Sequence, residues 1–325
     1  MTVSRAINRS GYVSEDVRTR VQAAVDQLQY RPNILARQLK GQRLNAVGVL
    51  LPDIANPFAN ELLVGIKEVL DAGGYTAFIT ISGGSVEDES AALQSFVDHR
   101  IDGLLIATRG SMLGDKALAQ IAAQHVPMVT VGRPVAIEGV DCISADHYRG
   151  ALEAVSHLIA CGHKRIGYIG TAHPDNPMPR RLEGYQAALA TAGIPFCSTY
   201  TVRAVAAPAF ATEEDGYLGM LELAKLPEPP TAVFARNDFA AIGALRAAHT
   251  LGLAVPQQIA IVGFDNIRMA AYTTPPLTTI EQPIIDQGRM AAQFLLDRIE
   301  GRVKGKPRSV VMDCRMVVRE SAGKS

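Results

Sequence analysis

The chain has 325 residues, of which 48% are hydrophobic, and its 32 Lys and Arg residues balance its 32 Asp and Glu residues. This length allows more than one sizeable hydrophobic core, and the composition excludes a disordered chain. The formal net charge of zero excludes a global field that attracts nucleic acid, so any such contact needs a local basic patch.

The N-terminal segment carries such a patch. A helical pattern runs from Thr2 to Asn8, and a second begins after Ser14, a candidate N-cap, and continues to Leu28. Two helices of this size bury too little surface to close a core by themselves. Basic residues outnumber acidic ones up to residue 43: Arg5, Arg9, Arg18, Arg20, Arg31, Arg37, Lys40 and Arg43 against Glu15, Asp16 and Asp26.

The next stretch joins two kinds of structure. Pro32 can open a very short helix over Asn33 to Lys40, and Gly41 offers a stop for it. A helix this short is marginal in water unless something binds it. Ala46 to Leu51 is then a continuous β-favouring apolar run, which predicts a strand buried on both faces and the start of a parallel sheet.

From this point strands and amphipathic helices alternate. Between most strands lies a helical pattern, such as Phe58 to Ala72 or Ala240 to Leu251. Repeated βα alternation predicts parallel sheets with right-handed crossovers, and so many strands favour two doubly wound lobes over one sheet. The predicted strands are Ala46 to Leu51, Tyr75 to Ile81, Gly103 to Ile106, Pro127 to Val131, Asp141 to Ser144, Ile166 to Ile169, Ala232 to Phe234, Ile259 to Val262, Thr278 to Ile280 and Ser309 to Val318.

Sequence motifs for catalysis, cofactors and metals are missing. No Rossmann fingerprint follows a predicted strand, residues 301–306 fail the P-loop spacing, and neither GxSxG nor HExxH occurs. The seven histidines are scattered, so we expect no metal site, no cofactor and no enzyme. The four cysteines have no CxxC spacing, and the sequence shows neither a signal peptide nor a membrane-spanning stretch. We therefore expect a cytoplasmic protein.

Several strings together point to one family. TVSRAIN, GYVSEDVRTRVQAAVDQLQYRPNILARQL and AVGVLLPDIANPF resemble, in order and spacing, the start of a LacI/GalR-family transcriptional regulator. The likeness continues through RIGYIG, RLEGYQAAL, AVFARNDFAAIGAL, VGFDN and PPLTTIEQP, and so covers essentially the whole chain. Each string is weak alone, but their ordered sum is a strong signal.

The resemblance implies a DNA-binding head. In the family a first helix and a turn precede the recognition helix, and Met1 stands where that helix is already under way, so we expect a partial helix-turn-helix over residues 1–29. Thr2, Ser4 and Arg5 match recognition-helix positions that face the major groove or nearby phosphates.

A hinge helix and linker are expected over residues 30–45. The positions that match the hinge helix are Asn33, Ala36, Arg37 and Leu39, and in the family this helix pairs with a second copy in the minor groove. Leu39 matches the apolar wedge that such a pair drives between base steps. The alternative is that Leu35 and Leu39 pack on the following domain and the basic residues form a solvated face.

For the rest of the chain the resemblance implies two α/β lobes like those of periplasmic sugar-binding proteins. We expect the N-terminal lobe to span residues 46–145 and 276–304, and the C-terminal lobe residues 146–275 and 305–320. The chain would then cross between the lobes near residues 144–146, 272–276 and 303–307. A small ligand is expected between the lobes, at the carboxyl ends of the strands.

Side chains just past the predicted strands are candidates to bind this ligand: Phe58, Arg133, Arg181, Asn237 and Asp265. Arg, Asn and Asp together suit a polyhydroxylated ligand, because Asp accepts from vicinal hydroxyls, Arg donates in a fork and Asn does both. The resemblance implies that Phe58 gives an aromatic face to the effector. A sugar is the preferred effector class, although a purine could use the same groups with an aromatic stack.

Two of these polar groups have simpler interpretations. Asp238, next to Asn237, would only cap the helix that follows it, and Asp265 with Asn266 would only form a turn.

The sequence thus predicts a DNA-binding transcriptional repressor controlled by a sugar-like effector and acting as a homodimer. The tail RESAGKS carries no heptad that would build a tetramer. The alternative is a cytoplasmic sugar-binding protein without a DNA role.

Overall fold

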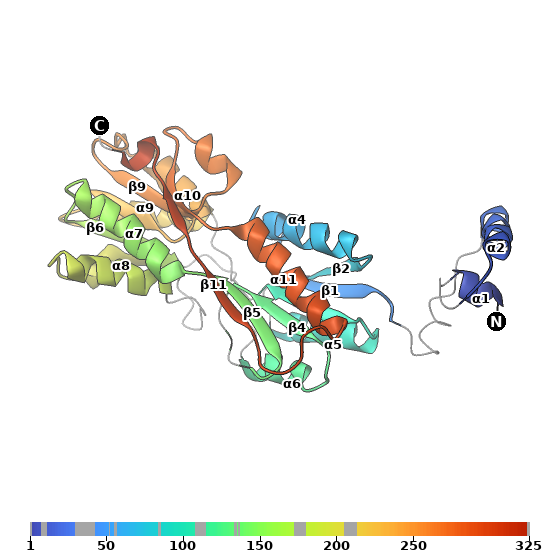
Figure 1. Ribbon diagram of the computed structural model, residues 1–325. Helices are drawn as coiled ribbons and strands as arrows, with labels where there is room; N and C mark the ends of the chain where they lie inside the picture. The colour runs from blue at the N-terminus through green and yellow to red at the C-terminus, as the bar shows by residue number, and fades with distance from the viewer. Residues whose placement is uncertain are drawn as a thin grey trace. The chain divides into compact units, whose positions relative to one another are not determined.

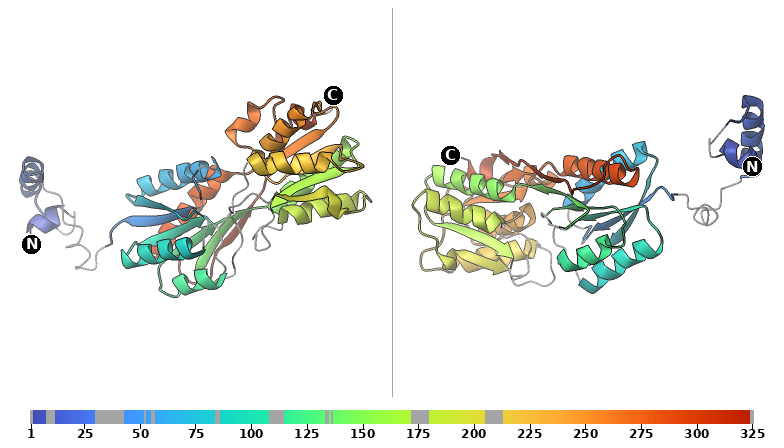
Figure 2. Two further views of the ribbon diagram at one scale, coloured as in Figure 1. Left: turned by 180° about the vertical axis from the view of Figure 1, so that it is seen from behind. Right: turned by 60° about the horizontal axis from the view of Figure 1, so that its bottom comes forward.

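The structure is a computed structural model that describes residues 2–7, 12–29, 43–51, 53–54, 57–83, 86–107, 115–132, 135, 137–171, 180–204 and 213–323. The chain forms two compact units, residues 1–44 and 45–325. In the larger unit parallel sheets are covered by helices on both faces, as Figures 1 and 2 show. The predicted fold class of two α/β lobes is confirmed.

The smaller unit contains the helices α1 (Thr2–Ile7) and α2 (Glu15–Gln27), which pack on each other. Ser14 precedes α2 as expected, but its side chain makes no capping hydrogen bond. No residue of α2 is buried, which agrees with a helix pair too small to close a core. The predicted hinge helix, Asn33 to Lys40, lies outside the described residues.

The N-terminal lobe is built on a parallel sheet whose described strands follow the order β11-β5-β4-β3-β1-β2. These strands are β1 (Ala46–Leu51), β2 (Thr76–Ile81), β3 (Gly103–Ala107), β4 (Met128–Val131), β5 (Val140–Ala145) and β11 (Ser309–Met312). In Figure 1, α4 (Pro57–Ala72) and α11 (Ile284–Ile299) cover one face, and α5 (Val86–Asp98) and α6 (Asp115–Ala122) cover the other.

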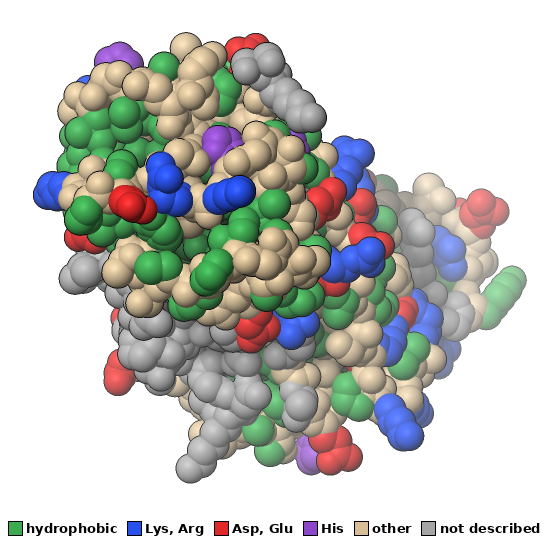
Figure 3. All heavy atoms as spheres, turned by 90° about the vertical axis from the view of Figure 1, so that its left-hand side faces the viewer, with side chains coloured by type: hydrophobic (Ala, Val, Ile, Leu, Met, Phe, Trp, Pro, Cys, Tyr) green, Lys and Arg blue, Asp and Glu red, His purple; other side chains and the backbone are tan. Residues whose placement is uncertain are grey.

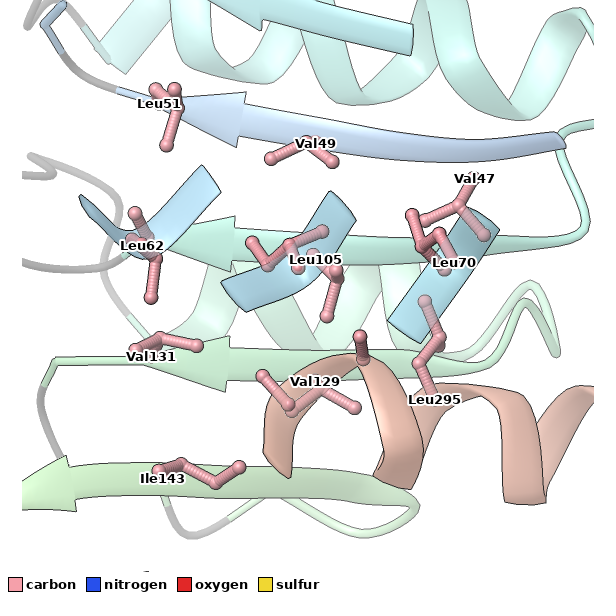
Figure 4. Packing of buried hydrophobic residues seen from close by; sticks show 14 of the residues in the cluster. Val47, Val49, Leu51, Leu62, Leu70, Leu105, Val129, Val131, Ile143 and Leu295 are labelled. Atoms are coloured by element: carbon pink, nitrogen blue, oxygen red, sulfur yellow. The ribbon is translucent and has the colours of Figure 1, made fainter. Parts of the chain in front are cut away.

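The core of this lobe follows from the alternation of side chains along β1. Val47, Val49 and Leu51 point to the face covered by α4 and α11, where they join Leu62 and Leu295 in one apolar cluster (Figure 4). The helices approach closely because glycines face the partner backbone: a Cβ atom at position 65 would collide with Ile285, and one at position 288 would collide with Leu62. This packing holds α4 and α11 closely together on the sheet.

The C-terminal lobe repeats the plan with the strand order β12-β10-β9-β8-β6-β7, in which only the described pair β10–β12 is antiparallel. Its strands are β6 (Ile166–Thr171), β7 (Thr201–Ala204), β8 (Ala232–Ala235), β9 (Ala260–Asp265), β10 (Thr278–Glu281) and β12 (Arg315–Val317). The helices are α7 (His147–Ala160), α8 (Arg180–Thr191), α9 (Glu213–Ala224) and α10 (Asp238–Thr250), with short 3-10 turns η1 (Ser198–Tyr200), η2 (Arg268–Ala271) and η3 (Glu320–Ala322).

The chain passes between the lobes at three places, and two of them differ from the expectation. The first crossing lies at Asp146, between β5 and α7. The second lies at residues 282–283 rather than 272–276, because β10 still pairs with β9. The third lies at residues 313–314 rather than 303–307, because β11 pairs with β5 in the N-terminal lobe before β12 joins β10.

Two strand predictions are also corrected. The run Ser309 to Val318 is not one strand but β11 and β12, which belong to different sheets. Its apolar alternation continues across the crossing, so no turn signal marks the break. β7 was not predicted, because this short edge strand has little apolar character. Among the helices that the structure describes, none is long and apolar enough to cross a membrane.

Candidate ligand-binding site

A buried ion pair lies at the carboxyl end of the C-terminal sheet. Arg181 is in the first turn of α8 and Asp265 is the last residue of β9, and they are 4% and 3% exposed. Nη2 of Arg181 lies 3.2 Å from Oδ1 of Asp265. The guanidinium covers the ring of Phe264, with Cζ 3.7 Å from the ring centroid, and Nη1 donates to the carbonyl of Arg236. The predicted residues Arg181 and Asp265 are therefore brought together and held rigidly.

Asp265 and Asn266 have a backbone conformation that side chains disfavour. Their φ angles are 119° and 56°. Surrounding side chains hold this conformation: Gln282 Nε2 donates to Asp265 Oδ1 at 2.6 Å, and Arg319 Nη2 donates to Asn266 Oδ1 at 2.7 Å. Backbone strain that is held in place like this is common at ligand sites.

The residue that caps α10 is Asn237 rather than Asp238. Asn237 is the N-cap of α10, and its side chain accepts from the N–H of Ala240 at 3.0 Å. Asp238 does not cap; it is fully buried and accepts from the hydroxyl of Thr279 and, at 2.8 Å, from the N–H of Ile267. The interpretation of Asp238 as a cap is therefore wrong.

The environment of Asp238 disfavours its charge. Burial, together with the nearby carboxylate of Asp265, raises the pKa of Asp238 to about 7, and the hydrogen bonds from Thr279 and Ile267 oppose the shift only in part. A carboxyl group with so strongly raised a pKa beside an ion pair is typical of a functional site.

His147 is a member of the cluster that the sequence did not predict. This residue opens α7 and is 4% exposed. Its Nδ1 lies 3.2 Å from Nη2 of Arg181, and its Nε2 lies 3.3 Å from the carbonyl oxygen of Gly132 at the end of β4. The position of His147 shortly after the predicted strand Asp141 to Ser144 is the signal that could have found it. The same is true of Gln282, which directly follows β10.

The N-terminal lobe contributes α4 to the same region. Burial raises the pKa of Glu61 in this helix, and the carboxylates of Asp265 and Glu281 in the C-terminal lobe raise it further. Phe58, which opens the helix, is 5% exposed and belongs to the apolar core. Arg133 lies outside the described residues.

A separate hollow of about 280 Å³ lies at the opposite, amino end of the C-terminal sheet. Its polar side chains are engaged within the lobe: Arg165 donates to the carbonyl of Pro229, and Gln258 accepts from Ala254. Figure 3 shows this end of the lobe, where hydrophobic side chains reach the surface in several places. The polar cluster around Arg181 is the better ligand site.

In the smaller unit, α1 carries Thr2, Ser4 and Arg5, and the side chain of Arg5 is exposed. The hinge positions Asn33, Ala36, Arg37 and Leu39 lie outside the described residues. Within the described part of the chain, no group of three or more His, Cys, Asp or Glu residues could hold a metal ion.

Comparison with known proteins gives the same picture. Residues 1–33 match the model of the bacterial regulatory proteins of the lacI family, and residues 155–322 match the periplasmic binding protein-like domain. The HTH-type transcriptional repressor CytR of Escherichia coli K12 is 35% identical over 320 residues, which cover 98% of this chain and 92% of that protein.

Solved structures agree. The transcriptional regulator CelR–cellobiose complex has a TM-score of 0.77 at 30% identity, and the match covers 98% of this chain and 95% of that one. The lac repressor dimer bound to operator and the anti-inducer ONPF has a TM-score of 0.84 at 26% identity, with 99% and 94% covered.

Two α/β lobes with a polar cluster at the strand ends, preceded by a helical unit, define a regulator of the periplasmic-binding-protein type. The chain belongs to the lacI family of bacterial regulatory proteins. It is a DNA-binding transcriptional regulator with an effector-binding domain.

Proposed function

We propose that this regulator is a homodimeric repressor whose effector is a sugar or sugar derivative bound by Arg181, Asp265 and Asn237, with Phe58 and Arg133 from the N-terminal lobe. The observation that carries the proposal is the buried Arg181–Asp265 pair at the carboxyl ends of the strands. We assign the Arg181–Asp265 pair to ligand binding rather than to catalysis.

The chemistry of the cluster favours hydroxyl groups as ligands. A carboxylate accepts from two neighbouring hydroxyls, while a guanidinium donates to their oxygens in a fixed fork. Because both groups are buried and already oriented, little side-chain entropy remains to be lost on binding. The cellobiose complex of CelR supports a sugar over a purine.

A homodimer is supported by the surface of the N-terminal lobe. The edge strand β2 exposes Phe78, Ile79 and Ile81, which are 51%, 49% and 46% exposed, and Val64 of α4 is 48% exposed. An exposed apolar edge strand favours association with another surface, and a second copy of this chain would bury it. A symmetric dimer also presents two heads to a near-palindromic operator.

The DNA contacts belong to the same proposal, and with them we propose that the protein acts in the cytoplasm. Thr2, Ser4 and Arg5 would face the major groove or phosphates, and Asn33, Ala36, Arg37 and Leu39 would form a minor-groove hinge. Arg5→Ala should lower affinity for the preferred duplex about tenfold or more, and Leu39→Ala should reduce DNA bending. Selection from random duplexes supplies the operator; no enrichment over Arg5→Ala would favour the sugar-binding protein without a DNA role.

Titration calorimetry tests the effector class. Cellobiose, ribose, adenosine and adenine are titrated into the wild-type protein, and we expect a sugar to bind. Arg181→Lys and Asp265→Asn should each weaken that binding about tenfold or more, because both remove a charge-assisted fork. Exposed Arg246→Ala serves as the control. Binding of adenine, which has no hydroxyl group, with no binding of either sugar would overturn the proposal.

A further inference from the structure

The side chain of His147 connects the two lobes. The residue follows the crossing at Asp146, so its backbone begins a helix of the C-terminal lobe directly after a strand of the N-terminal lobe. Its ring reaches the carbonyl oxygen of Gly132 on one side and the guanidinium of Arg181 on the other, at 3.3 and 3.2 Å. A 4% exposed ring excludes most of the solvent from both contacts.

These contacts select one tautomer. A guanidinium nitrogen can only donate, so Nδ1 of His147 must accept from Arg181. The ring proton then sits on Nε2, where it can be donated to the carbonyl of Gly132, which can only accept. Both contacts therefore require the same neutral form of the imidazole, and a proton on Nδ1 would break the contact with Arg181.

Both ends of this link are held in place. The N–H of Gly132 donates to the carbonyl of Ile143 at 2.9 Å, which fixes the carboxyl end of β4 on β5. Arg181 stacks on Phe264 and pairs with Asp265. The ring of His147 also lies near Phe264, with 5.7 Å between ring centroids. A movement of the N-terminal lobe would therefore pull on the hydrogen bond that orients Arg181.

We propose that His147 is a positioning residue that couples the effector site to the arrangement of the two lobes. The proposal rests on the assignment of Arg181 to effector binding. While Gly132 holds Nε2, the ring presents Nδ1 to Arg181 and keeps the guanidinium oriented. When the lobes shift, the ring is released and Arg181 loses that acceptor. Effector affinity and lobe arrangement thereby become linked.

Two substitutions of His147 each keep one of its two contacts and remove the other. In His147→Asn the amide oxygen takes the place of Nδ1 and can accept from Arg181, but the side chain is too short to reach Gly132. In His147→Gln the amide nitrogen reaches the place of Nε2 and can donate to Gly132, but no acceptor remains at the place of Nδ1. Exposed His249→Gln is the matched control.

The measurements are the dissociation constant for the sugar that binds the wild type, and the ratio of operator affinities with and without that sugar. His147→Gln should weaken sugar binding about tenfold, the effect of one lost hydrogen bond to a charged group. His147→Asn should keep sugar affinity within about threefold but reduce the effect of the sugar on operator affinity about fivefold or more. Equal losses in both variants, or an unchanged ratio in His147→Asn, would overturn the proposal.

A spectroscopic measurement needs neither effector nor operator. Nitrogen-15 spectra of histidine-labelled protein distinguish protonated from unprotonated ring nitrogens, and the signal absent in His147→Gln identifies His147. We expect the proton on Nε2, and a proton on Nδ1 would overturn the link even if a variant fails to fold.

The two proposals fail in different ways. If Arg181→Lys leaves sugar binding unchanged, the effector assignment is wrong whatever the tautomer of His147. If Arg181→Lys weakens binding while both His147 variants behave like His249→Gln, the effector site stands and the coupling role of His147 is wrong.

Discussion

Two buried aspartates, one in each lobe, have opposite surroundings. Both Asp141 in β5 and Asp238 in α10 are fully buried. Asp141 is surrounded by two arginines: Arg298 lies 2.7 Å from Oδ1, and Arg308 lies 2.7 Å from Oδ2. Asp238 accepts only neutral donors among its described partners, the hydroxyl of Thr279 and the N–H of Ile267.

The difference appears in the pKa of each group. Burial raises the pKa of Asp141, but the hydrogen bonds from Arg298 and Arg308 outweigh it, and the net pKa is lowered. Burial raises the pKa of Asp238 to about 7. Asp141 connects β5 with α11 and with the segment before β11, and two arginines compensate its buried charge. The buried carboxyl group of Asp238, beside the candidate ligand site, has only neutral hydrogen-bond donors among its described partners.

The largest effect is expected from removing the compensated charge. Asp141→Ala leaves two arginines without their buried partner and should lower the free energy of unfolding by about 3–5 kcal/mol. Urea unfolding followed by circular dichroism measures the change. As a control, Arg289→Ala breaks an exposed network with Glu68 and Asp286 and should change stability far less. Similar losses in both variants would contradict the structural role of Asp141.

A smaller loss is expected from Asp238→Ala. The substitution leaves the hydroxyl of Thr279 and the N–H of Ile267 without their acceptor, which costs about 1–3 kcal/mol, but it also removes a carboxyl group whose charge is disfavoured by burial. The same urea experiment should therefore show a smaller loss than for Asp141→Ala. An equal or larger loss would mean that the different surroundings of the two aspartates do not lead to different contributions to stability.

The sequence predicts the fold well because its signals are local. The apolar run of β1 and the repeated βα alternation determine two parallel sheets without knowledge of any distant contact. The crossings at residues 282–283 and 313–314 could not be located, because the choice of sheet depends on the pairing of β10 with β9 and of β11 with β5.

The site was predicted only in part. Arg181 was found because it opens the string RLEGY, and Asp265 because it follows the apolar run of β9; the structure brings the two together. His147 was missed, since its importance arises only where Gly132 and Arg181, which are distant in the sequence, meet its ring. The role of Phe58 stays a prediction: the residue opens α4, and its side chain packs against the apolar core of the N-terminal lobe.

The sharpest test of the comparison is the dependence of stability on pH. The pKa of Asp238 is higher in the folded state than in the unfolded chain, where it is about 3.9. The folded protein therefore binds this proton more tightly, and the contribution of Asp238 to stability rises as the pH falls from about 7 towards 4, by at most about 1.4 kcal/mol per pH unit.

Asp141 has the opposite sign. Its lowered pKa stabilises the folded state above the unfolded value of about 3.9, and that contribution is lost as the pH falls from this value through the lower pKa of the folded state. His163, whose pKa is lowered by burial and by His157, also contributes to the pH dependence of stability. Subtracting the unfolding free energies of Asp238→Asn from those of the wild type at pH 5, 6, 7 and 8 cancels this contribution. The difference should shift in favour of the wild type at low pH, and a flat difference would mean that Asp238 is ionised like an ordinary carboxylate.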